Sequence, residues 1–426
     1  MSETSARDSK RRANAAAATA AFAAVVLWMS ACSPPPTGEA PTESGPAAFV
    51  LKGIAEPLKT AEGKDAPGSA AERLARQKKL GRSYSTRFDL AALPEYVPAR
   101  QVSGTIRIWG NNYIDASGLA KAWTDEFRTF HPGAAFELVL PTAAAAIPAL
   151  YFGLADLAMT HQPTFYDSLT HLRILGYAPT GFMAVTGSFD QSGWMNSIAI
   201  AVHKDNPIDK ITLQQLDGIF GSARMGGWDG TTWRADWARG PERNIRTWGQ
   251  LGLTGAWARQ RITPYGYSVT YSTAQAFSRM VLQDGDRWNE DLQDFGNIRN
   301  PDGTQTLQAT QIIDRLKADP HGIAYIRYQK GFADVGLKYL PVARDGEGPY
   351  VPFTIENIQN RTYPLAEEMN FWVSVKPGTK MDPKVKEFLR YVFSRQAQNL
   401  VQEVDGKYLP LCADIVRREL ARLDQY

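Results

Sequence analysis

The chain has 426 residues, which is too long for one compact domain and predicts two or three. Its content of 44% apolar and 21% charged residues is typical of a soluble globular protein. The formal net charge of +3 is too small to indicate a nucleic-acid partner, and part of it lies near the amino terminus, in Arg7, Lys10, Arg11 and Arg12.

An export signal is the first predicted element, at residues 1–31. The four cations precede a mostly apolar run, residues 15–29, which is short for a membrane span and has the layout of a secretory signal. Small residues directly before Cys32 resemble the lipobox of bacterial lipoproteins, although Met29 stands where leucine is usual. The resemblance implies an acylated Cys32 and a periplasmic or cell-surface protein that is anchored to the membrane. Ordinary cleavage nearby and a retained anchor are the alternatives.

A tether is predicted after the signal, at residues 32–101. Its first part is rich in proline, glycine and small polar residues, which favour extended, mobile chain. Ordered structure is expected to begin near Val102. Cys412 is the only other cysteine, so an acylated Cys32 excludes an intramolecular disulfide. Two distant cysteines and five scattered histidines predict no metal site.

Beyond the tether, strand-like and helix-like apolar patterns alternate, which predicts α/β architecture with a largely parallel sheet. Strands are expected at residues 105–109, 136–140 and 156–160, and helices at 119–130 and 143–154. Ligands of such sheets bind at the carboxyl ends of the strands, near helix amino termini. The residues after the three strands are therefore candidate ligand contacts: Asn111, Asn112, Tyr113, Thr142, Ala143, Thr160 and His161.

A series of short motifs follows in a fixed order along residues 103–411. The motifs occupy residues 103–107, 131–133, 155–159, 199–207, 211–220, 262–266, 322–325, 363–365, 385–389 and 406–411. The ordered series resembles the phosphate-binding, PstS-like family of periplasmic binding proteins. The resemblance implies a type II clamshell, in which two α/β lobes are joined by two extended hinge crossovers and enclose a solute. Lobe one is then expected at 102–187 plus 350–426, lobe two at 197–345, and the hinge region at 188–196 and 346–349.

The resemblance also implies further site residues. One cleft loop of the family begins with arginine and ends in Ser-Gly-Thr at a helix start, where this chain has Tyr267 and then Ser272 and Thr273. Another usually offers serine and then an acid or arginine, where this chain has Thr160 and His161. The arginine and the acid expected for phosphate are thus missing. Ser272 and Thr273 are equally ordinary helix-capping residues.

The implied function is an exported solute-binding protein, without a cofactor, that holds a small ligand and delivers it to an ABC permease. Phosphate or a related oxyanion would rely on neutral donors and helix dipoles, with His161 as a donor, or as a cation at mildly acidic pH. The alternative is a cleft for a neutral, aromatic or phosphorylated solute, used for uptake or sensing. Aromatic side chains that favour it are Trp109, Tyr113, Tyr267 and Tyr271. Trp109 is also expected in the core.

No enzyme is expected, because the sequence contains no nucleophile elbow, zinc-protease helix, phosphate-binding Walker loop or dinucleotide fingerprint. The adjacent acids Glu367 and Glu368 are expected on a solvated surface. Residues 225–243 contain three tryptophans among arginines and acids and are expected as a long loop of lobe two. This loop is predicted to contact a partner, to cover the cleft, or to pack back on its own lobe.

Overall fold

The computed structural model describes residues 83–191, 194–302, 304–327 and 335–426. The expected signal, Cys32 and the tether up to residue 82 lie outside this range. The described residues belong to one compact unit. No helix within the described ranges is long and apolar enough to cross a membrane.

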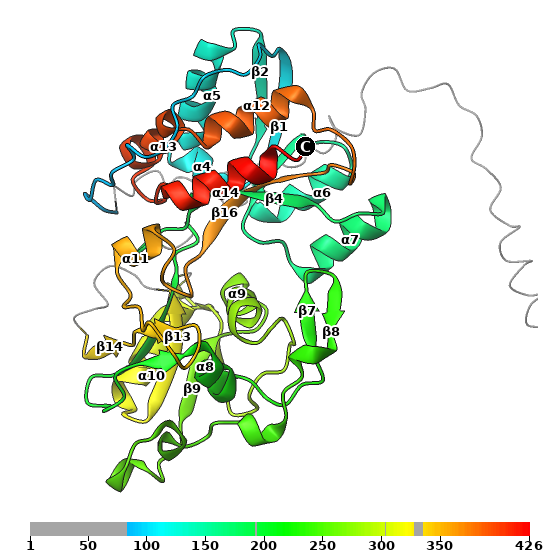
Figure 1. The fold of residues 1–426 in the computed structure, drawn as a ribbon. Coiled ribbons are helices and arrows are strands. Elements are labelled where there is room, and N and C mark those ends of the chain that lie inside the picture. Colours follow the sequence, from blue (N-terminus) through cyan, green and yellow to red (C-terminus); the bar gives the residue numbers. More distant parts are fainter. Residues whose placement is uncertain (1–82, 192–193, 303, 328–334) are drawn as a thin grey trace, which may run out of the picture. The chain divides into compact units, whose positions relative to one another are not determined.

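The first of two five-stranded sheets has the strand order β2-β1-β3-β16-β4 (Figure 1). Its strands are β1 (Gly104–Gly110), β2 (Ala134–Val139), β3 (Leu157–Thr160), β4 (Thr180–Thr186) and β16 (Glu368–Val373). Strand β1 is parallel to β2 and β3, whereas β16 is antiparallel to both β3 and β4. The three strands expected from the sequence are therefore adjacent, and their carboxyl ends lie at one edge.

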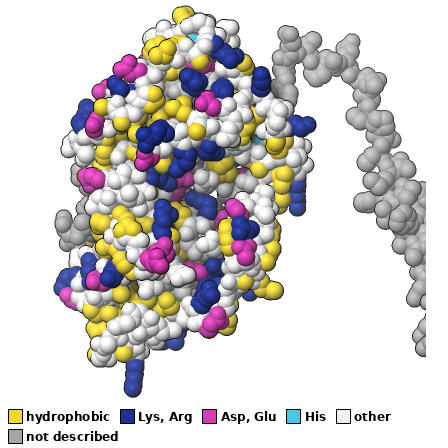
Figure 2. Space-filling view, in the orientation of Figure 1, with side chains coloured by type: hydrophobic (Ala, Val, Ile, Leu, Met, Phe, Trp, Pro, Cys, Tyr) yellow, Lys and Arg dark blue, Asp and Glu magenta, His cyan; other side chains and the backbone are white. Residues whose placement is uncertain are grey.

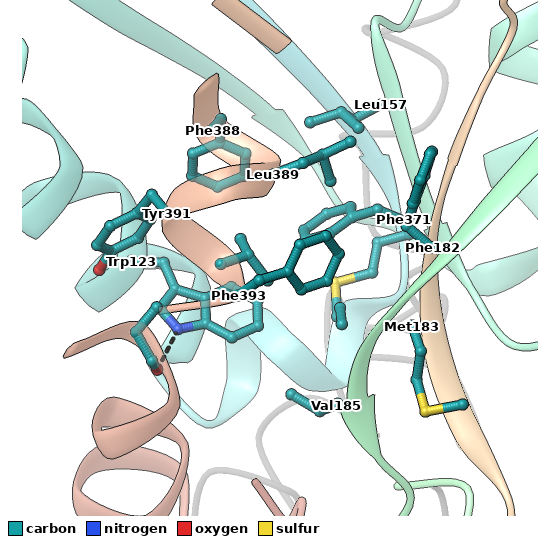
Figure 3. Packing of buried hydrophobic residues seen from close by; sticks show 14 of the residues in the cluster. Trp123, Leu157, Phe182, Met183, Val185, Phe371, Phe388, Leu389, Tyr391 and Phe393 are labelled. Atoms are coloured by element: carbon teal, nitrogen blue, oxygen red, sulfur yellow. Dashed lines mark hydrogen bonds between the residues drawn. The ribbon is translucent and has the colours of Figure 1, made fainter. Parts of the chain in front are cut away.

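Helices from both ends of the chain cover this sheet and complete lobe one (Figure 1). They are α4 (Asn112–Ala116), α5 (Leu119–Phe130), α6 (Ala146–Tyr151), α7 (Phe165–Leu175), α12 (Pro383–Val392), α13 (Arg395–Leu400) and α14 (Ala413–Leu423). Trp123 and Phe127 of α5 are buried, as their helical spacing predicts. Figure 3 shows Trp123 among the aromatic side chains of this core, with its indole N–H donating to the Ala397 carbonyl at 2.8 Å. Its ring centroid lies 6.1 Å from that of Phe371 on β16. Aromatic packing thus joins segments from the two ends of the chain.

The second sheet has the order β10-β9-β13-β5-β14 and forms the core of lobe two. Its strands are β5 (Ile198–His203), β9 (Thr263–Tyr267), β10 (Gln293–Phe295), β13 (Gly322–Arg327) and β14 (Leu337–Tyr339). Helices α8 (Leu213–Phe220), α9 (Ser272–Val281) and α10 (Gln308–Ala318) belong to the same lobe. Both sheets place one antiparallel strand among parallel ones, since β5 is antiparallel to β13 and β14.

Lobe two also carries short elements outside its main sheet. Strands β6 (Ile211–Thr212) and β15 (Val342–Ala343) form one pair, and β11 (Ile298–Arg299) and β12 (Gln305–Thr306) another. The expected tryptophan-rich loop contains an antiparallel hairpin of β7 (Gly227–Asp229) and β8 (Thr232–Arg234). A two-residue turn, Gly230 and Thr231, joins its strands, and Gly230 has a φ of +59°.

The expected tether boundary at residue 101 is wrong. Tyr84, Leu90, Leu93 and Tyr96 are buried in the hydrophobic cores, and the Tyr96 hydroxyl donates to Glu387 at 2.9 Å. Residues 83–101 contain no helix or strand. Such a segment has no periodic apolar pattern, so its packing was not visible in the sequence.

The chain returns to lobe one later than expected. Helix α11 (Ile355–Gln359) and the following Tyr363, Leu365 and Ala366 pack with the core of the second sheet, and the Tyr363 hydroxyl donates to the Ile198 carbonyl at 3.0 Å. The return crossing therefore lies at residues 366–368, beyond the expected position of 346–349. Apolar residues of this kind fit either core, so the pattern alone did not place them.

The expected alanine-rich helix at 143–154 is also shorter than predicted. A single 3-10 turn, Ala143–Ala145, precedes α6, which ends at Tyr151. Gly153 follows with a φ of +69°, a left-handed conformation that ends the helix. The chain then enters β3.

Candidate functional site

Loops at the carboxyl ends of β1 and β3 are held together at one edge of the first sheet. Gly110 has a φ of +136°, and a Cβ atom there would lie 2.2 Å from the Met159 carbonyl oxygen. Glycine therefore permits the close approach in which the Asn111 backbone N–H donates to that oxygen at 2.9 Å. The Asn111 side chain is buried and accepts from the Tyr113 N–H at 2.7 Å, which caps α4.

Several expected contacts at this edge have structural roles in lobe one. The Tyr113 ring packs edge-on against Trp194 at a centroid distance of 4.7 Å, and Trp109 is buried, as expected for a core residue. Thr142 is exposed and caps the 3-10 turn by accepting from the Ala144 N–H. Asn112 and Ala143 are half-buried.

His161 follows the buried Thr160 at the end of β3. Its Nδ1 lies 2.6 Å from the Gln162 carbonyl oxygen, so this nitrogen carries the proton and donates it. Burial lowers the pKa of His161, because the charged ring would lose its hydration. The Gln162 carbonyl and Glu367 act in the opposite direction without reversing the shift.

His161 is therefore neutral at neutral pH, and its Nε2 offers a lone pair. Because Nδ1 already donates to Gln162, the neutral ring has no second N–H group to offer as the expected donor. The lowered pKa requires a more acidic solution to charge the ring.

Two expected residues of lobe two, Tyr267 and Thr273, meet around an arginine that the sequence analysis missed. The Tyr267 hydroxyl, on a side chain that is 2% exposed, accepts from the Arg327 backbone N–H at 3.0 Å. Thr273 Oγ1 accepts from Arg327 Nε at 2.7 Å. Arg327 stands at the carboxyl end of β13, so the strand-end rule that selected the other candidates would also have found it.

Arg327 joins lobe two to both crossings between the lobes. Its Nη1 donates to the Asn196 carbonyl at 2.8 Å, and its Nη2 donates to Glu367 Oε1 at 3.0 Å. The crossings themselves lie side by side, because the Gly187 N–H donates to the Glu367 carbonyl at 2.7 Å. All three side-chain nitrogens of Arg327 thus have protein acceptors.

Glu367 and Glu368 are buried, which contradicts the expected solvated surface. Burial alone would raise the pKa of Glu368, but Arg361 and Arg279 outweigh it and lower the pKa. Glu368 accepts from Arg361 at 2.7 Å and from Gln162 of lobe one at 3.0 Å. The two adjacent acids therefore bind different arginines, Glu367 binding Arg327 and Glu368 binding Arg361.

Arg279, on α9, is the cation of this cluster whose donors remain available. Its Nη2 lies 3.9 Å from Glu367 Oε2, beyond hydrogen-bond distance, and it makes no hydrogen bond to any residue that the structure describes. Its side chain is 31% exposed, compared with 8% for Arg327. Arg279 is also one of the charges that lower the pKa of His161, so it lies within electrostatic range of this residue of lobe one.

The cluster contains three guanidinium groups, on Arg279, Arg327 and Arg361, and two carboxylates, on Glu367 and Glu368. Asp284 is close enough to Arg279 to interact with its charge, so the set is balanced when Asp284 is ionised and carries one positive charge when Asp284 is protonated. Figure 2 shows Lys and Arg side chains gathered across the middle of the visible face. Within the described ranges, no group of histidine, cysteine and acidic side chains could hold a metal ion.

Ser272 begins α9 and is exposed. The residue in the N-cap position is Tyr271, whose side chain makes no capping hydrogen bond. Neither Ser272 nor Thr273 is therefore the helix cap that the alternative interpretation assumed. The first N–H groups of α9 are left without a side-chain acceptor.

Two α/β lobes of this strand order, joined by two adjacent crossings with polar residues between them, define a two-lobed solute-binding protein. The chain belongs to the family described as the PBP superfamily domain, whose model matches residues 99–396.

Curated relatives include the phosphate-binding protein PstS of two Pseudomonas aeruginosa strains, PAO1 and UCBPP-PA14. Each is 28% identical over 333 residues, which covers 78% of this chain and 91% of the relative. Among solved structures, PstS from Borrelia burgdorferi is 14% identical with a TM-score of 0.45 and covers 73% of this chain and 100% of its own. A phosphate transport receptor from Vibrio cholerae is 18% identical with a TM-score of 0.40, and the match covers 71% of this chain and 99% of the receptor chain.

Proposed function

We propose that this chain is an exported solute-binding protein that holds phosphate, or a closely related oxyanion, between its lobes and presents it to an ABC permease. Its family supports the assignment as a solute-binding protein, and the name of the Pseudomonas relatives supports phosphate as the ligand. The observation that carries the proposal is Arg279, a partly exposed guanidinium group that has no hydrogen-bond acceptor among the described residues. An oxyanion supplies the acceptors that this guanidinium lacks.

Donors from α9 complete the anion site in this proposal. Thr273 Oγ1 already accepts from Arg327, so its own O–H proton is directed to a different acceptor. The first N–H groups of α9 lack a side-chain cap and add the positive end of the helix dipole. Ser272 adds an exposed hydroxyl at the same helix start. Tyr267 occupies the position at which the family has an arginine, and it carries no positive charge. In this proposal Arg279 supplies that charge.

His161 gives the site a preference among oxyanions. Its neutral ring donates from Nδ1 to Gln162, so Nε2 accepts a hydrogen bond. Hydrogen phosphate carries a proton that it can donate, whereas sulfate carries none near neutral pH. The site therefore favours a protonated oxyanion, with His161 in the position where the family usually has an acid or arginine.

The aromatic alternative has less support, because the rings it requires already have protein partners. Trp109 and Tyr267 are buried. The Tyr271 hydroxyl accepts from the Asn297 N–H at 3.1 Å, and the Tyr113 ring packs on Trp194. The named relatives are binding proteins, and the proposal assigns transport to this chain in place of catalysis.

Lobe closure, membrane anchoring and the permease are further parts of the proposal. The hinge consists of the adjacent crossings at residues 187–197 and 366–368. Lobe one then contains residues 102–186 and 369–426, and lobe two the residues between the crossings. A lipid on Cys32 would hold the protein at the membrane, where a permease receives the ligand.

Calorimetric titration of the purified full-length chain tests the ligand. Phosphate and arsenate are expected to bind, and sulfate to bind more weakly. His161→Phe keeps a flat ring and removes Nε2, so it should weaken phosphate binding about 10-fold and leave sulfate binding unchanged. No heat at millimolar phosphate, with clear binding of a neutral or aromatic solute, would sink the proposal.

A further inference from the structure

A row of aromatic rings connects the two lobes away from the hinge. The Phe165 ring, from lobe one, lies 4.6 Å from Trp228 of the β7–β8 hairpin in lobe two. The row continues on each side, with Tyr166 at 5.5 Å from Phe165 and Trp233 at 5.1 Å from Trp228. Figure 1 shows α7 meeting β7 and β8 at this place. The hairpin therefore contacts the opposite lobe.

The lobe-one side of this contact continues directly from the candidate site. Phe165 is the first residue of α7 and comes four positions after His161. A capping box fixes this helix start, because Thr164 Oγ1 accepts from the Asp167 N–H and Asp167 accepts from the Thr164 N–H, both at 3.1 Å. A movement of the His161 loop would therefore move the Phe165 ring.

The lobe-two side continues from α9, which carries Arg279. The Trp228 N–H donates to the Gln283 carbonyl at 2.9 Å, in the turn that follows α9. A Cβ atom at Gly227 would lie 2.4 Å from the same oxygen, so glycine permits this approach. Gln283 and Asp284 have φ values of +58° and +47°, conformations that non-glycine residues adopt only where surrounding contacts enforce them.

Buried ion pairs hold the base of the hairpin to lobe two. Arg224 Nη1 donates to Asp217 Oδ1 at 2.7 Å, and Arg224 Nε donates to the Trp237 carbonyl at 3.2 Å. Arg239 Nε lies 3.3 Å from Asp217 Oδ2. Both arginines and Asp217 are almost fully buried in this arrangement. The hairpin therefore moves with α8 and α9, and its tryptophan is not a mobile surface side chain.

We propose that Trp228 and Phe165 form a latch that holds the lobes together over a bound ligand. Trp228 is a positioning residue, because it acts through lobe closure. Each half of the latch is a short, fixed extension of a ligand-binding segment. Closing the latch therefore brings the His161 loop and α9 together around the ligand. This inference rests on the proposed function for its ligand and on the ring contact for its mechanism.

The kinetics of phosphate binding test the latch. Phe165→Ala and Trp228→Ala are each expected to raise the release rate about 3- to 10-fold, with little change in the association rate. The double variant should release phosphate no faster than either single variant, because both changes remove the same contact. Tyr166→Ala is the matched control, since this exposed ring touches Phe165 and makes no ring contact with lobe two in the described structure. Unchanged release in both single variants, or additive effects, would overturn the latch.

A measurement without ligand separates the latch from the proposed function. Small-angle X-ray scattering of the full-length chain should give a larger radius of gyration for the Phe165→Ala and Trp228→Ala variants than for the wild type and Tyr166→Ala. Equal radii in all four proteins would contradict the latch whatever the ligand is. Failure of the wild type to bind phosphate would instead contradict the proposed function, and the scattering result would still decide the latch.

Discussion

Replacing Arg279 by glutamine removes the cation on which the proposed anion site depends. Glutamine keeps a polar side chain of similar length on α9 and removes the charge. Hydrogen bonds to charged groups contribute about 1.5 to 3 kcal/mol each, so the loss of one predicts an affinity for phosphate that is about 10- to 150-fold weaker. The fold should tolerate the change, because Glu367 keeps Arg327 at 3.0 Å.

Isothermal titration calorimetry measures this change, and urea unfolding measures the stability of the same protein. Arg315→Gln, at an exposed position of α10, is the control and should bind phosphate like the wild type. The loss in Arg279→Gln should be smaller at high salt, because part of the attraction is screened. Wild-type affinity in Arg279→Gln would refute the assignment of this side chain to the ligand.

Two further predictions concern buried charges. Arg327→Met leaves Glu367 buried without its closest cation and should lower the free energy of unfolding by about 3 to 5 kcal/mol in urea titrations; a loss below about 1 kcal/mol would show that the pair is dispensable. Burial raises the pKa of Asp284 from 3.8 to about 6, so its charge costs about 3 kcal/mol above pH 6 and nothing below about pH 4. Asp284→Asn should therefore be more stable than the wild type at pH 7.5, and this advantage should disappear between pH 6 and 4. A stability difference between Asp284→Asn and the wild type that stays constant across that range would contradict this prediction. The same pH dependence in the exposed control Asp314→Asn would also contradict it.

The sequence predicted the parts of the site that follow local rules. Apolar periodicity located β1, β2 and β3, and the strand-end rule selected Thr160 and His161. Arg327, at the carboxyl end of β13, also satisfies this rule but is absent from the predicted site. Gly230, at the first position of a two-residue turn, likewise indicates the hairpin that was expected as a loop.

Other features could not be predicted, because they depend on contacts between distant segments. Glu367 resembles a surface acid until the fold places Arg327, forty positions earlier in the chain, at 3.0 Å from it. The pKa of His161 is lowered by burial, which depends on the segments that pack around it. Residues 83–101 pack through isolated apolar side chains without any helix or strand. None of these features has a periodic signature.

A crystal structure of the full-length chain with arsenate most directly tests the central claim that an oxyanion binds between the lobes. Arsenic gives an anomalous signal that locates the anion without reference to the protein model. The account predicts one strong peak between the lobes, with arsenate oxygens within hydrogen-bond distance of Arg279 and Thr273. A peak elsewhere on the protein, or an empty space beside Arg279 at an arsenate concentration that saturates binding in solution, would contradict it.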